Sequence, residues 1–91
     1  MKLTVYLEEG CLGCERARQI ADEVERSHDA VDVEVLDLSE VKEIPEAVIA
    51  VPAYVLDGRL VYLGNPRLAE ISTLIEEGLA AEGRLDRAEK A

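Results

Sequence analysis

The sequence contains neither phenylalanine nor tryptophan, and its only aromatic residues are Tyr6, Tyr54 and Tyr62. The hydrophobic core must therefore consist mainly of aliphatic side chains. No apolar run is long enough to cross a membrane or to form the core of a signal peptide, because two glutamates end the N-terminal apolar stretch after residue 7. These absences predict a cytoplasmic protein without a membrane partner.

Basic residues are also scarce. Ten lysines and arginines stand against 20 aspartates and glutamates, which gives a formal net charge of −10. Nucleic acids and anionic membrane surfaces are bound through basic patches, so this composition argues against both partners. The length of 91 residues and the hydrophobic fraction of 48 % fit one globular domain. We expect this domain over 1–83, as a monomer, with a polar tail over 84–91.

Hydrophobic periodicity predicts the element order β-α-β-(short α)-β-β-α. Strands are expected near 2–8, 31–37, 53–57 and 59–63, and helices near 14–27 and 66–81. The first two strands are joined by a helix and should therefore be parallel. The sequence thus predicts an α/β fold in which helices flank a mixed four-stranded sheet.

Local turn and cap signals refine this prediction. Asp57-Gly58 predicts a two-residue hairpin loop between the last two strands. Asn65 and Pro66 are expected to begin the last helix, as its N-cap and its first residue. A short or irregular helix is expected within 39–50, with Ser39 as its cap.

The two cysteines of the sequence, Cys11 and Cys14, lie where the first predicted strand gives way to the first helix. A helix N-terminus carries a partial positive charge that stabilises a thiolate, and the thiolate is the nucleophile in disulfide exchange. Two intervening residues allow the second sulfur to reach the first. Cys11 should therefore be the exposed nucleophile, and Cys14, one turn inside the helix, the shielded resolving thiol.

Charged residues near this pair act in opposite directions. The helix N-terminus lowers the expected pKa of the Cys11 thiol, whereas neighbouring carboxylates favour the neutral thiol. The neighbouring acids are Glu8, Glu9 and Glu15, and the bases that offset part of their charge are Arg16 and Arg18. We therefore expect a moderately lowered pKa for Cys11.

Two motifs and the order of the elements resemble the thioredoxin/glutaredoxin superfamily, in particular its short thioredoxin-like members. The first motif is Cys11-Leu12-Gly13-Cys14, directly after the first strand, and the second is Ile49-Ala50-Val51-Pro52-Ala53-Tyr54, directly before the third. The resemblance implies a thioredoxin-like fold in which Pro52 is a cis-proline lying against the cysteine pair.

The resemblance also implies a function. Cys11 and Cys14 would cycle between dithiol and disulfide as nucleophile and resolving cysteine of a thiol–disulfide oxidoreductase, with no other cofactor and no metal. Val51 would offer its backbone to an extended substrate segment, and Leu12 and Gly13 would complete the substrate-binding positions. The implied partners are a disulfide-containing protein or small-molecule disulfide and an unidentified reductase.

The sequence departs from the family pattern at several positions. A buried acid that assists the resolving thiol in many thioredoxins is replaced by Val5, and Tyr6 or a nearby glutamate would have to substitute for it. The Gly-Gly turn with which glutaredoxins bind glutathione is replaced by 64–66, Gly-Asn-Pro, and a threonine common after the cis-proline is replaced by Ala53. These departures argue against glutathione as a dedicated substrate.

Two other interpretations stay open at the level of sequence. The chain could be a thioredoxin-fold interaction module whose cysteines are inactive or regulatory. It could also be a soft-metal carrier, a class that places two cysteines between strand and helix but ends on a strand. A structural zinc site wants four ligands, whereas the chain offers two cysteines and His28, which we expect near the end of a helix.

Overall fold

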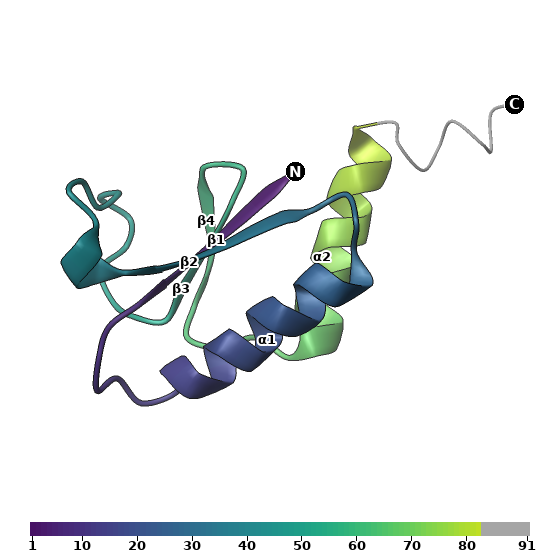
Figure 1. Cartoon of the computed structure of the whole chain (residues 1–91). Coiled ribbons are helices and arrows are strands. Elements are labelled where there is room, and N and C mark those ends of the chain that lie inside the picture. The colour runs from purple at the N-terminus through teal and green to yellow at the C-terminus, as the bar shows by residue number, and fades with distance from the viewer. Residues whose placement is uncertain (83–91) are drawn as a thin grey trace, which may run out of the picture.

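The computed structural model of the chain describes residues 1–82 (Figure 1). Its elements follow the predicted order, with a 3₁₀ helix at the place of the short helix. They are β1 (Lys2–Leu7), α1 (Cys14–Ser27), β2 (Asp32–Asp37), η1 (Leu38–Glu40), β3 (Ala53–Leu56), β4 (Arg59–Leu63) and α2 (Leu68–Ala81). The predicted domain end at 83 and the predicted tail over 84–91 lie outside the described residues.

The four strands form one mixed sheet in the order β2-β1-β3-β4. β1 pairs in parallel with β2 and antiparallel with β3, and β3 pairs antiparallel with β4, which confirms the predicted α/β topology. The β3–β4 loop is Asp57-Gly58, whose φ angles of 49° and 83° are the positive values that a tight primed turn requires. The Asp57 carboxylate also accepts a hydrogen bond from the Lys2 backbone N–H at 2.8 Å, which ties this loop to the start of β1.

Both helices pack on the same face of the sheet (Figure 1). Alternate residues of β1 point to this face, as the period of two predicts. The shared core contains the fully buried aliphatic residues Leu3, Val5, Leu7, Ile20, Val24, Ile71 and Ile75. This aliphatic layer fixes α1 against β1 and so determines where the helix N-terminus lies relative to the sheet.

The opposite face of the sheet is covered by the segment between β2 and β3. Buried residues of the sheet form a second apolar cluster with half-buried residues of this segment. The buried members are Tyr6, Ala53 and Val55, and the packed residues of the segment are Leu38, Val41, Val48 and Val51. The two faces of the sheet are therefore covered differently. Helices cover one face, and mainly irregular chain covers the other.

The prediction of a helix within 39–50 is wrong for most of this segment. Only η1 forms, and its cap is Asp37 rather than Ser39, because the Asp37 carboxylate accepts hydrogen bonds from the Ser39 N–H at 2.9 Å and hydroxyl at 2.7 Å. Further along, Pro45 forms a turn in which its carbonyl accepts from the Val48 N–H at 2.9 Å. A proline in mid-segment and several β-branched residues disfavour a continuous helix here.

The start of α2 also differs from the prediction. Its N-cap is Arg67, whose backbone N–H donates to the Glu70 carboxylate at 2.8 Å, and the first helical residue is Leu68. Pro66 is buried just before the helix, and Asn65 does not cap it. The Asn65 side chain is instead engaged by two distant segments of the chain, as described below.

Candidate active site

The cysteine loop leaves the sheet at the carboxyl ends of two parallel strands. Leu7 at the end of β1 lies opposite Asp37 at the end of β2, and the loop over 8–13 then leads into α1. The loop is a tight turn in which the Cys11 N–H donates to the Glu8 carbonyl at 3.2 Å. The edge formed by the carboxyl ends of parallel strands is a common place for functional groups. The fold therefore places both cysteines at this edge.

Cys11 and Cys14 are joined by a disulfide bond, and their Cα atoms lie 5.6 Å apart. Cys14 is the first residue of α1 and belongs to the aliphatic core, with 7 % of its surface exposed. Cys11 precedes the helix and is half-buried. The two cysteine residues thus differ in exposure in the direction that the predicted roles of attacking and resolving thiol require.

The segment before β3 approaches this loop. The Val51–Pro52 peptide bond is cis, as the resemblance implied. Pro52 is buried, and its Cδ lies 4.0 Å from the point where a Cβ on Gly13 would stand. Val51 is half-buried, and no backbone hydrogen bond to it is formed by the residues that the structure describes. The two predicted motifs therefore meet, with one unpaired stretch of backbone beside the cysteine loop.

A chain of two hydrogen bonds connects the cysteine linker to the end of the sheet. The Tyr54 hydroxyl donates to Asn65 Oδ1 at 2.7 Å, and Asn65 Nδ2 donates to the Gly13 carbonyl at 2.9 Å. Tyr54 is fully buried and packs edge-to-face on Tyr62, with ring centroids 6.2 Å apart. Burial raises the pKa of Tyr54, so its hydroxyl stays protonated and remains a donor.

A groove with a volume of about 580 Å³ opens beside the disulfide. Both cysteines line it together with five charged side chains, which are Glu8, Glu9, Glu15, Arg18 and Asp37. Four carboxylates against one guanidinium make the groove strongly acidic. Hydrogen bonds from Ser39, with a smaller contribution from Arg18, lower the pKa of Asp37 and keep it ionised.

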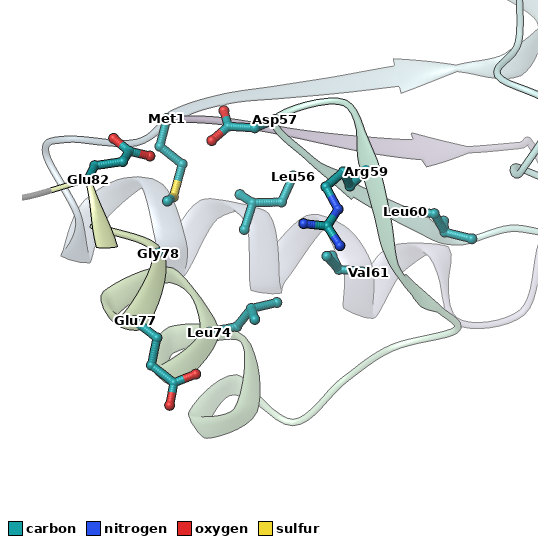
Figure 2. A pocket seen from close by; sticks show the side chains of 10 residues that line it. All are labelled: Met1, Leu56, Asp57, Arg59, Leu60, Val61, Leu74, Glu77, Gly78 and Glu82. Atoms are coloured by element: carbon teal, nitrogen blue, oxygen red, sulfur yellow. The ribbon is translucent and has the colours of Figure 1, made fainter. Parts of the chain in front are cut away.

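A second cavity, of about 410 Å³, lies between α2 and the β3–β4 hairpin (Figure 2). Its apolar wall includes Met1, Leu56 and Leu74, and its rim carries Arg59 and Glu77. Figure 2 shows the Met1 side chain extending toward the α2 ribbon at Gly78. None of the predicted site residues lines this cavity.

The remaining candidate from the sequence, His28, lies away from the disulfide. It is the C-cap of α1, at the opposite end of the helix from Cys14, and the His28 Nε2 lies 3.6 Å from the Glu76 carboxylate of α2. Within residues 1–82, no group of three or more His, Cys, Asp or Glu residues is arranged to hold a metal ion. No helix among the described residues has the length and apolarity that a membrane span needs.

The position of the family's buried acid is occupied by aliphatic core. Val5 is fully buried on the helix-facing side of β1. Tyr6, considered as a substitute, belongs to the cluster on the opposite face, and Glu8 and Glu9 are exposed. None of these residues therefore reproduces a buried carboxyl beneath the cysteines.

Sequence reasoning missed three residues of the site. The sequence assigns no role at the cysteine pair to Tyr54 or Asp37, and it predicts Asn65 only as a helix cap. A signal for Asp37 existed, because the predicted parallel pairing brings the end of the second strand beside the cysteine loop. No local signal marks the link between Tyr54 and Asn65, since it depends on how the last strand ends against α1.

Comparison with known proteins agrees with this geometry. Residues 1–76 match a protein-family model described as a thioredoxin domain. The matched region contains both cysteines and Pro52, and the described chain ends on α2 rather than on the strand that a soft-metal carrier would have. A comparison with curated protein sequences gave no match.

Proposed function

Because the chain belongs to the thioredoxin-domain family, we propose that it is a thiol–disulfide oxidoreductase that reduces disulfides through Cys11 and Cys14. The observation that carries this proposal is the bonded cysteine pair at the N-terminus of α1, with one sulfur-bearing residue partly exposed and the other buried. A purely structural disulfide needs no such difference in accessibility, whereas exchange requires it.

The proposed reaction proceeds in two exchange steps. In the dithiol form, the Cys11 thiolate attacks one sulfur of a partner disulfide, a mixed disulfide forms, and the partner's other sulfur leaves as a thiolate. The Cys14 thiolate then attacks the Cys11 sulfur, the Cys11–Cys14 disulfide forms, and the second partner sulfur leaves. Two electrons pass to the partner, and a separate dithiol reductase restores the cysteine pair.

The helix N-terminus supports the first step. The first N–H groups of α1 have no carbonyl partner within the helix, and together they carry a partial positive charge. Cys11 lies just before this end, so its thiolate gains from the same charge. The acidic neighbours of the loop oppose this effect, so the thiolate is stabilised only in part.

The segment before β3 supports substrate binding. The unpaired backbone of Val51 can pair with an extended peptide in the manner of an added strand. Leu12 lies between the cysteines with 95 % of its surface exposed, which offers an apolar contact that a protein partner would cover. Gly13 has no side chain and therefore leaves the surface beside Pro52 open. We therefore assign substrate positions to Val51, Leu12 and Gly13.

The acidic groove bears on the choice of partner. Its four carboxylates lie along the approach to the disulfide, and none of the ion pairs formed within residues 1–82 neutralises Glu8, Glu9 or Glu15. A cationic disulfide partner would be attracted to this groove and an anionic one repelled. We therefore propose cationic protein segments as substrates. Action in the cytoplasm stays a prediction from the sequence.

Single-cysteine variants test the proposed roles. Cys14→Ser should form mixed disulfides with an oxidised peptide and release them slowly, because the resolving thiol is missing. Cys11→Ser should form few, because the remaining thiol is buried at the helix start. The chain has only two cysteines, so each variant retains one thiol and each adduct has one site, which mass spectrometry without reductant can count.

Three outcomes are decisive. Trapping by Cys14→Ser alone, together with disulfide reduction by the native chain, supports the proposal. Equal trapping by both variants contradicts the division of roles. No trapping by either variant and no reduction of an oxidised peptide by the native chain would overturn the enzymatic function and favour the interaction-module interpretation.

A further inference from the structure

The cysteine linker is held from outside its own loop. Gly13 stands between the two cysteines, and its carbonyl accepts from Asn65 Nδ2 at 2.9 Å and from the Ala17 N–H at 2.9 Å. Asn65 is 52 residues further along the chain, just after β4. One exposed carboxamide therefore connects the linker to the end of the sheet.

The orientation of this carboxamide follows from its partners. A carbonyl oxygen can only accept, so the Asn65 atom that faces Gly13 must be the nitrogen. The Asn65 oxygen then faces the Tyr54 hydroxyl at 2.7 Å, and this hydroxyl must donate. Since Tyr54 is fully buried in the sheet, it provides a rigid anchor for the amide.

Gly13 is shaped to allow this contact. Its φ of 87° lies in the left-handed region, and a Cβ at this position would stand 3.0 Å from Asn65 Nδ2. Any side chain would therefore be strained by the backbone and would also press against the carboxamide. The glycine in the linker permits the hydrogen bond that holds the linker.

We infer that Asn65 is a positioning residue for the disulfide exchange proposed above, on which this inference rests. By fixing the Gly13 carbonyl, Asn65 holds the linker in the arrangement that brings Cys14 to Cys11. In the dithiol form this restraint raises the effective concentration of one thiol at the other. The restraint thus favours the closed disulfide and speeds the step in which Cys14 displaces a bound partner.

The test is an equilibrium between the chain and a redox buffer of reduced and oxidised dithiothreitol. As the chain closes its disulfide, two electrons and two protons pass to oxidised dithiothreitol, which becomes the dithiol. Asn65→Ala should lower the equilibrium constant for closure about two- to tenfold, the factor that corresponds to the net contribution of one hydrogen bond. Asn65→Asp keeps the acceptor for Tyr54 but loses the donor to Gly13, so its decrease should be at least as large.

Gln19→Ala is the matched control. It removes another exposed carboxamide, one that accepts from Arg16 on α1 and does not contact the linker. The equilibrium constant of this variant should equal that of the native chain. Unfolding of the oxidised and reduced forms by urea gives a second measurement, because a positioning role makes Asn65→Ala destabilise the oxidised form more than the reduced form.

The outcomes separate this inference from the proposed function. A native chain that exchanges with the buffer, together with an unchanged equilibrium constant in Asn65→Ala and equal destabilisation of both forms, would show that Asn65 is merely structural and overturn the inference alone. A native chain whose cysteines do not exchange with dithiothreitol at all would overturn the proposed function and the inference with it. A selective decrease in both Asn65 variants supports the inference.

Discussion

Replacing Tyr54 with phenylalanine removes one hydroxyl group from a fully buried ring and leaves the ring itself in place. At neutral pH the loss is one hydrogen bond, the 2.7 Å contact to Asn65 Oδ1. A net contribution of about 0.5–1.5 kcal/mol is typical for such a bond. The Asn65 side chain is exposed, so water can satisfy its oxygen in the variant, and we expect a loss toward the lower end of that range.

The same substitution should change the pH dependence of stability. Burial raises the pKa of Tyr54 in the folded chain, whereas the unfolded chain ionises near the ordinary tyrosine value of 10.0. Because the folded pKa is the higher one, the contribution of Tyr54 is fully present below pH 10 and declines as the pH rises above it. Linkage sets the slope at about 1.4 kcal/mol per pH unit for one proton. Phenylalanine has no proton to lose, so the variant lacks this decline.

The assay is the free energy of unfolding in urea for both proteins at pH 7, 9, 10 and 11. The native chain should be the more stable at pH 7, and the order should reverse by pH 11, because ionisation of the unfolded tyrosine one unit above its pKa costs about 1.4 kcal/mol and exceeds the contribution of the hydrogen bond. All other titrating groups, including the partly buried Tyr62, are common to both proteins and cancel in the difference. A constant difference between pH 7 and pH 11 would refute the argument that burial keeps the Tyr54 hydroxyl protonated.

Three further predictions concern a helix glycine, a hairpin glycine and substrate charge. Gly78→Ala should stabilise the chain by about 0.5–1 kcal/mol through helix propensity, because only the flexible end of Met1 must move aside. Gly58→Ala should destabilise it by about 1–2 kcal/mol, since its φ of 83° is left-handed, and urea unfolding that ranks the two variants otherwise would contradict this. The double variant Glu8→Gln, Glu9→Gln should lower the rate ratio for cystamine over glutathione disulfide about threefold at low salt, with the difference shrinking at high salt. An unchanged ratio would show that the acidic groove does not select substrates by charge.

Much of the fold follows from local sequence patterns. The alternation in β1 and the helical period of α1 each specify one apolar face, and burial of these faces against each other requires the parallel βαβ unit. Asp57-Gly58 specifies its hairpin because few residues tolerate positive φ at both positions. The cysteine pair could likewise be placed at the start of α1, because only a few residues separate the two cysteines from the beginning of the helical pattern.

The tertiary structure decided what depends on residues far apart in sequence. The segment over 39–50 carries helix-like caps, yet it packs as irregular chain because its branched residues cover the second face of the sheet. Asparagine is a residue type that often caps helices, yet the Asn65 amide forms hydrogen bonds with Tyr54 and Gly13. The helix α2 begins later, at Leu68. A cap and a bridge use the same donor and acceptor atoms, so only the distances set by packing determine which one forms. The sequence alone therefore determined the sheet, the first helix and the cysteine pair, whereas the contacts that hold the cysteine linker were decided by the arrangement of strands and helices around it.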